Sequence, residues 1–160
     1  MNDAAAPADI DPIDRLTILA AALPGAVVRQ RRVAAPFEAV WQVIADLEHA
    51  TPTYEPGVAH VRLIERHGEL LRLLVQDTSG HEEMMDARLR PGWCLMQSAT
   101  VVVAFAARPL GSQTLLVHLE NQRVQIPLPS QSRSHYRHAA EAKIDQELQI
   151  IEQLATQNSK

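Results

Sequence analysis

The chain has 160 residues and a net charge of −4, with 46% apolar against 21% charged residues. This balance excludes a disordered chain, and no apolar run reaches the ~18 residues that a bilayer span requires. We expect one soluble domain with one core and no integral membrane segment. The charges supply no clustered basic surface for phosphates, so we also expect no nucleic-acid partner.

The cysteine content and the N-terminal residues bear on the cellular compartment. Cys94 is the single cysteine, so an internal disulfide cannot form, as is usual in a reducing compartment. The first residues lack the basic and apolar regions of a secretory signal. We therefore expect a cytoplasmic protein.

Residues 1–25 are expected to form an N-terminal extension. Residues 1 to about 10 have too little apolar bulk to fold alone and should be dispensable. Asp11 can cap a short helix that has Pro12 at its first position. Its apolar residues recur at helical spacing: Ile13, Leu16, Ala20 and Leu23. This stripe must pack on its own domain or on a second subunit, so one alternative is a homodimer through this helix or through a sheet edge.

From Ala26 onward, glycines separate segments of roughly ten residues, which is typical of a strand meander. Val27–Ala34 is the first expected strand. After Pro36, apolar residues at helical spacing predict a short helical insertion that ends at Pro52 and Pro56. Six further strands follow, antiparallel because their turns are short: Val58–Arg66, Glu69–Thr78, His81–Arg90, Trp93–Gln97, Thr100–Arg108 and Ser112–Asn121.

One long amphipathic helix is expected after Pro129. Its apolar stripe consists of Tyr136, Ala140, Ile144, Leu148, Ile151 and Ala155. Because an antiparallel sheet must bury its apolar face against helices, the order of elements predicts an α+β fold. In this fold a curved, seven-stranded antiparallel sheet wraps around the C-terminal helix. The domain should span residues 26–156, with 157–160 as a tail, and a curved sheet gripping one helix tends to leave a cavity.

Three segments carry a family resemblance: Val33 to Trp41 (VAAPFEAVW) with the nearby Ala45-Asp46-Leu47, Pro52 to Val58 (PTYEPGV), and Pro109 to Thr114 (PLGSQT). In this order and spacing the chain resembles the START-like, or SRPBCC, superfamily of polyketide cyclase-like and birch-pollen-allergen-like proteins. The resemblance covers residues 26–156. It implies a helix-grip fold with a hydrophobic cavity under the long helix, and relatives use that cavity for lipids, sterols, quinones, hormones or aromatic polyketides. It does not fix the ligand and offers no catalytic residue to transfer.

The residues expected to line such a cavity are large or apolar side chains from both helices and strands: Trp41, Tyr54, Met85, Trp93, Val103, Phe105, Val117, Tyr136, Ala140 and Ile144. For each, ordinary core packing is the alternative. Tyr136 stands out because its hydroxyl needs a polar partner. In the last two strands the neighbouring Val102, Ala104 and Leu116 are apolar as well, so the alternation does not identify the inner face.

Other candidate sites have simpler interpretations. The pairs His81/Glu83 and His135/His138 lack the third and fourth ligands of a metal site, so we expect no metal and no cofactor. Cys94 lies between apolar neighbours and should behave as a small hydrophobe. Three arginines of the first strand should face water, although one that points inward could pair with a carboxylate: Arg29, Arg31 and Arg32.

The expected function is binding of a small hydrophobic or aromatic molecule, such as a lipid, a quinone or a polyketide-like compound, in this cavity. One alternative is a cyclase or aromatase-like enzyme in which Tyr136, a histidine or an arginine acts as proton donor or oxyanion stabiliser. A second alternative is a protein-interaction module with a filled cavity.

Overall fold

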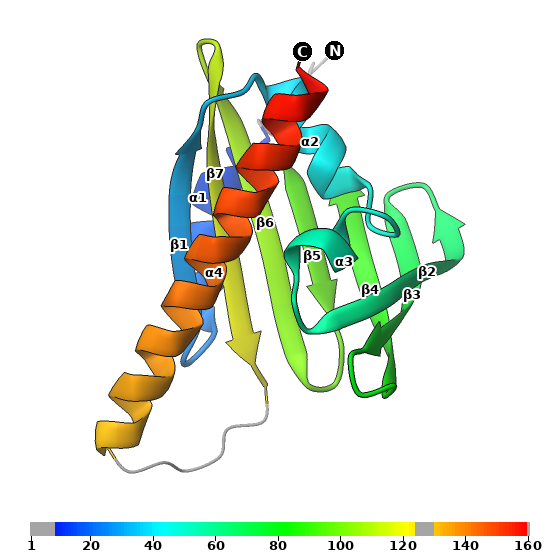
Figure 1. The fold of residues 1–160 in the computed structure, drawn as a ribbon, viewed down its shortest axis with the longest axis vertical. Coiled ribbons are helices and arrows are strands. Elements are labelled where there is room, and N and C mark those ends of the chain that lie inside the picture. The colour runs from blue at the N-terminus through cyan, green and yellow to red at the C-terminus, as the bar shows by residue number, and fades with distance from the viewer. Residues whose placement is uncertain (1–8, 124–129, 160) are drawn as a thin grey trace, which may run out of the picture.

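The computed structural model describes residues 9–123 and 130–159. The elements are α1 (Pro12–Ala22), β1 (Val27–Val33), α2 (Phe37–Ala45), α3 (Thr51–Tyr54), β2 (Val58–His67), β3 (Leu70–Asp77), β4 (Glu82–Arg90), β5 (Trp93–Gln97), β6 (Val101–Leu110), β7 (Gln113–Gln122) and α4 (Ser130–Asn158). The predicted fold class and order of elements are confirmed (Figure 1). Most of the leader expected to be dispensable, and Pro129, lie outside the described residues.

All seven strands form one antiparallel sheet in the order β1-β7-β6-β5-β4-β3-β2, so β1 and β2 are its two edges. β1 pairs with β7 from Val27 opposite Glu120 to Val33 opposite Thr114. The β2–β3 ladder has two register shifts, between Val58 and His60 and between Leu63 and Glu65. Such bulges bend and twist a strand locally. Figure 1 shows α4 lying across the inner face of the curved sheet.

The inner core is built around the apolar stripe of α4. Ile144, Leu148, Ile151 and Ala155 are all fully buried against the sheet and against α2. The first turns of α4 extend beyond the sheet, and residues 132–139 are exposed (Figure 1). The N-terminal part of the predicted apolar stripe, at Tyr136, therefore has no sheet to pack on.

A second apolar cluster lies on the outer face of the sheet, under α1. Leu16 of α1 is 1% exposed and packs in a cluster with Trp93 and Val117. The side chain of Asp11 accepts a hydrogen bond from the Ile13 N–H at 2.9 Å, which confirms the predicted cap. The apolar stripe of α1 therefore packs on its own chain. None of the described helices is long and apolar enough to cross a membrane.

The insertion between β1 and β2 differs from expectation at Pro52. Instead of ending the helical segment, Pro52 lies in the first turn of the short helix α3, where a missing N–H is tolerated. α3 places Tyr54 beneath the sheet, with its ring edge-on to Phe105 at a centroid distance of 5.9 Å. The insertion thereby carries one wall of the site described next.

Candidate functional site

A cavity of about 350 Å³ lies between the inner face of the sheet, α3 and α4. Its volume falls within the range of small-molecule sites. Most of its wall is apolar or aromatic: Tyr54, Val58, Val61, Leu73, Val75, Met85, Met96, Val101, Val103 and Phe105. Gly57 and a set of polar and charged side chains complete the lining: Thr51, Glu55, Asp77, Glu83, Thr100, His118, Glu120, Gln122 and Lys143.

Four of the residues expected from the sequence line this cavity: Tyr54, Met85, Val103 and Phe105. They come from the end of α3 and from two strands of the sheet. Three others lie in the inner core and are not part of the cavity lining. Trp41 is buried and stacks on Phe37 at 6.0 Å, Ile144 is fully buried, and Ala140 is partly buried. A direct role of any of these residues in ligand binding stays a prediction.

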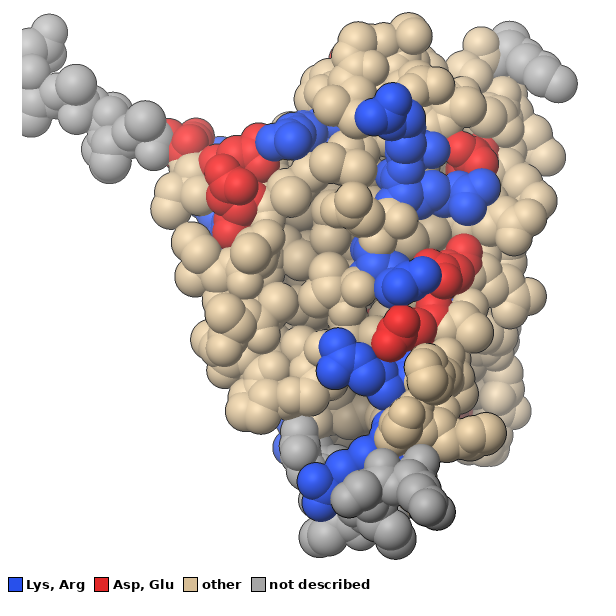
Figure 2. All heavy atoms as spheres, turned by 90° about the vertical axis from the view of Figure 1, so that its left-hand side faces the viewer, with Lys and Arg blue, Asp and Glu red and all other residues tan. Residues whose placement is uncertain are grey.

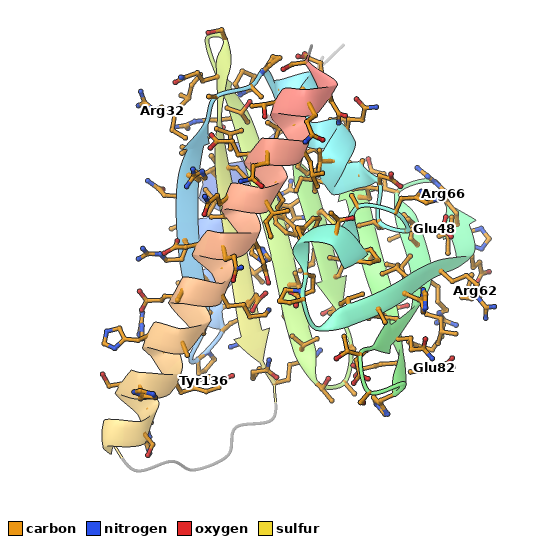
Figure 3. All side chains as sticks on the ribbon, in the orientation of Figure 1. Arg32, Glu48, Arg62, Arg66, Glu82 and Tyr136 are labelled. Atoms are coloured by element: carbon orange, nitrogen blue, oxygen red, sulfur yellow. The ribbon has the colours of Figure 1, made fainter. Side chains whose placement is uncertain are left out.

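The remaining three lie away from the cavity. Trp93 and Val117 belong to the outer cluster under α1, because β5, β6 and β7 are covered on both faces and apolar alternation cannot show which side is inner. Tyr136 is 50% exposed and lies on the part of α4 that extends past the sheet (Figure 3). Our expectation that these three face the cavity is corrected accordingly.

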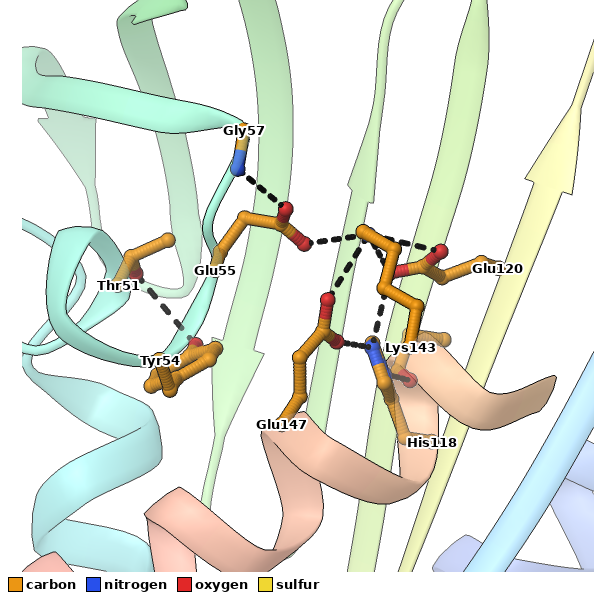
Figure 4. A network of polar contacts seen from close by, with 9 residues as sticks. Thr51, Tyr54, Glu55, Gly57, His118, Glu120, Lys143 and Glu147 are labelled. Atoms are coloured by element: carbon orange, nitrogen blue, oxygen red, sulfur yellow. Dashed lines mark hydrogen bonds and ion pairs between the residues drawn. The ribbon is translucent and has the colours of Figure 1, made fainter. Parts of the chain in front are cut away.

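A network of five charged side chains forms one end of the site (Figure 4). β7 contributes His118 and Glu120, α4 contributes Lys143 and Glu147, and Glu55 follows α3. The sheet, the long helix and the insertion therefore meet at these residues.

His118 is buried as an imidazolium. Its Nε2 lies 2.8 Å from Oε2 of Glu147, and its Nδ1 lies 3.0 Å from the carbonyl oxygen of Ala104. Since both partners are acceptors, both ring nitrogens must donate. Burial alone would lower the pKa of His118, but Glu120 and Glu147 outweigh it and raise this pKa to about 9. The ring also stacks on Phe105 at a centroid distance of 3.9 Å.

Glu147 is the buried carboxylate of the network, with 1% of the residue exposed. Burial would raise its pKa, but the contacts with His118, Glu55 and Lys143 outweigh burial and lower it to about 2. Its Oε1 lies 2.8 Å from Nζ of Lys143, in an ion pair that is not aligned as a hydrogen bond. Glu147 therefore links the imidazolium to the ammonium.

Lys143 is surrounded by three carboxylates. Besides Glu147, its Nζ lies 2.8 Å from Oε2 of Glu55 and 3.0 and 3.2 Å from the two oxygens of Glu120. Burial and the neighbouring Glu147 raise the pKa of Glu55 to about 7, although Lys143 opposes that shift. Glu55 consequently populates both the acid and the carboxylate near neutral pH.

Ligand atoms of His118, Glu120 and Glu147 lie within 4.8 Å of one another, which is the arrangement a metal ion would need. In this structure the Lys143 ammonium already places a positive charge beside two of the three. The two histidine pairs considered in the sequence, His81/Glu83 and His135/His138, are not part of this cluster. Glu83 lines the cavity and His81 is exposed, while His135 and His138 lie on the exposed turns of α4.

Sequence reasoning missed the network because its members are far apart in the chain. A signal was present in two places. His118 and Glu120 occupy alternate positions directly after the apolar run Leu115–Val117, and Lys143 and Glu147 are one helical turn apart beside the apolar stripe. A charged residue on a buried face must find a partner.

Two of the three arginines of β1 form ion pairs with carboxylates of α4, and Figure 2 shows basic and acidic side chains next to one another on this side of the molecule. Arg29 contacts Asp145 at 2.9 Å, and Arg31 contacts Glu152 at 2.8 Å. Arg32 is exposed, as expected for this strand. Cys94 is fully buried, and burial raises the pKa of its thiol to about 12, so it is not an activated nucleophile.

No family model and no curated protein sequence matches the chain, but solved structures do. The Thermus thermophilus protein TTHA0849 aligns with a TM-score of 0.67 and 17% identity, over 84% of this chain and 99% of that one. The ZhuI aromatase/cyclase of a Streptomyces species aligns with a TM-score of 0.63 and 18% identity, over 84% and 95%. A START superfamily protein of Mycobacterium smegmatis aligns with a TM-score of 0.59 and 20% identity, over 82% and 97%. With its curved antiparallel sheet closed on one long helix, the chain has the START-like helix-grip fold of these aromatase/cyclase and START superfamily structures.

Proposed function

We propose that the chain binds a small, largely apolar or aromatic molecule in the cavity under α4. The observation that carries this proposal is the cavity itself, about 350 Å³ with ten apolar or aromatic side chains in its wall. Burial of apolar ligand surface against that wall supplies most of the affinity. Lipids, quinones and polyketide-like compounds all have the required apolar body. The presence of the cavity does not support the alternative of a protein-interaction module with a filled cavity.

The test fills the cavity from one strand. Val75 lines the cavity, whereas the adjacent Leu74 points to the opposite face of β3, and both are partly buried. Val75→Trp should abolish binding of the uncharged fluorescent probe N-phenyl-1-naphthylamine, and Leu74→Trp should preserve it. Circular dichroism establishes that both variants are folded. Wild-type probe binding by a folded Val75→Trp protein would refute the cavity as the binding site.

A second candidate function is catalysis of the aromatase/cyclase kind, as in the ZhuI structure. The observation that favours it is Glu55, which lines the cavity and has a pKa of about 7, so that it can accept and return a proton near neutral pH. His118 cannot accept one, because both of its nitrogens already donate. Its imidazolium instead stabilises the carboxylate of Glu147.

Turnover of a poly-β-ketone substrate tests this second function. Glu55→Gln keeps the shape of the side chain but removes proton transfer, and should lower the rate by roughly 10²-fold or more. Glu82→Gln, an exposed change on β4, is the matched control. Equal turnover by Glu55→Gln and the control would refute a proton-transfer role for Glu55.

A further inference from the structure

The cations that face the cavity are already engaged by carboxylates. Among the described residues lining the cavity, the basic side chains are Lys143 and His118. An ammonium group has three N–H donors, and three carboxylates surround that of Lys143, from Glu55, Glu120 and Glu147. Both N–H groups of His118 are used as well. Carboxylates of the protein therefore already neutralise both cations.

Two acidic side chains elsewhere in the lining accept hydrogen bonds but have no lysine or arginine as an ion-pair partner in the part of the chain that the structure describes. Glu83 on β4 and Asp77 on the neighbouring β3 both line the cavity. The carboxylate of Glu83 accepts the Thr100 hydroxyl at 2.9 and 3.0 Å. Asp77 accepts hydrogen bonds from its own turn, including the Ser79 N–H at 2.9 Å. No lysine or arginine in residues 9–123 or 132–159 forms an ion pair with either one.

The carboxylates that line the cavity therefore outnumber its two cations. A ligand carboxylate would compete with protein carboxylates for these cations and would meet the further negative charges of Glu83 and Asp77, which is unfavourable at low ionic strength. A ligand ammonium or hydroxyl group would instead donate to carboxylate oxygens with unused acceptor capacity.

We propose that the ligand of this cavity carries a hydrogen-bond-donating polar end, best of all an ammonium group, which lies against Glu83 and Asp77, and that ligands ending in a carboxylate are rejected. This inference rests on the proposed binding function and specifies its ligand class.

A matched series of two-ring probes separates the two claims. Naphthalene tests the apolar cavity alone, while 2-naphthylmethylammonium, 2-naphthalenemethanol and 2-naphthoate add a cation, a neutral donor and an anion to the same ring system. At neutral pH and low salt, we expect the ammonium compound to bind about tenfold or more tightly than 2-naphthoate, with the alcohol between them. Binding of naphthalene together with equal or tighter binding of 2-naphthoate would overturn the ligand class while leaving the binding function intact. Failure of all four probes to bind would overturn both.

The residue assignment has its own test. Glu83→Gln should weaken binding of the ammonium probe by about tenfold and leave naphthalene binding unchanged. Glu82→Gln is the control, because Glu82 is adjacent on β4 but exposed on the opposite face (Figure 3). An unchanged preference for the ammonium probe in a folded Glu83→Gln protein would refute the assignment.

Discussion

The buried imidazolium of His118 should make the protein less stable as the pH rises. The pKa of His118 is about 9 in the folded chain, against an ordinary value of 6.5. A group whose pKa is raised on folding contributes stability that is fully present below its unfolded pKa and is lost as the pH rises through its folded pKa. The free energy of unfolding should therefore fall between about pH 6.5 and pH 9.

The difference between these two pKa values corresponds to about 3 kcal/mol over the whole window. Between about pH 7 and pH 8.5 the expected loss is about 2 kcal/mol, or about 5 °C in the melting temperature of a domain of this size. Two other groups act in the same direction but more weakly: Glu55, with a pKa of about 7, is already half ionised at pH 7, and His49, whose pKa is raised by its hydrogen bond to Asp46, is fully exposed. His118 should dominate the slope.

Urea unfolding of two variants at both pH values measures this contribution. His118→Phe keeps an aromatic ring on Phe105, but it leaves the buried Glu147 without its imidazolium and should cost about 3 to 5 kcal/mol near pH 7. His118→Phe/Glu147→Leu removes both charges and should recover much of that loss, with a much smaller slope between about pH 7 and pH 8.5 than the wild type. His135→Asn, a change on the exposed turns of α4, is the control and should keep the wild-type slope. A double variant that unfolds with the wild-type pH dependence would show that His118 is not the titrating group.

Leu16→Ala should destabilise the protein by about 2 to 5 kcal/mol, because Leu16 anchors α1 on the sheet. The control Ile18→Ala, at a position 63% exposed, should change stability by less than about 0.5 kcal/mol, and equal effects of the two in urea unfolding would contradict docking of α1. Tyr136→Ala should leave the binding of N-phenyl-1-naphthylamine unchanged because Tyr136 lies outside the cavity; a weaker affinity would place it in the site. Cys94 should react with iodoacetamide at neutral pH only after unfolding, because it is buried and its pKa is about 12; labelling of the folded protein, followed by mass spectrometry, would refute this.

The fold was predictable from local signals. Glycine-containing turns divide the meander, the Asp11-Pro12 pair starts a helix, and the spacing from Ile144 to Ala155 defines the buried stripe of α4. Each of these signals depends on neighbours in the sequence, so their order could be read without knowledge of tertiary contacts. Pro52 was misread because proline favours both the end of one helix and the first turn of another.

The site was predictable only in its apolar part. Phe105 and Met85 could be assigned to the cavity from size and strand position, but Val117 and Trp93 follow the same pattern on strands that are buried on both faces. The charged network depends on contacts between β7 and α4, such as that of His118 with Glu147, which are 29 residues apart. No spacing within one element can reveal such a pair.

The two edges of the sheet have consequences for association between molecules. An edge strand presents unpaired backbone groups on which a strand of another chain can add. At β1, the ion pairs of Arg29 with Asp145 and of Arg31 with Glu152 place charged groups beside the edge. At β2 the two bulges interrupt a regular pairing surface, and exposed Arg62, Glu65 and Arg66 make close approach of a second strand costly. Neither edge is therefore a ready template for β-aggregation, and this protection is independent of whether the cavity is occupied.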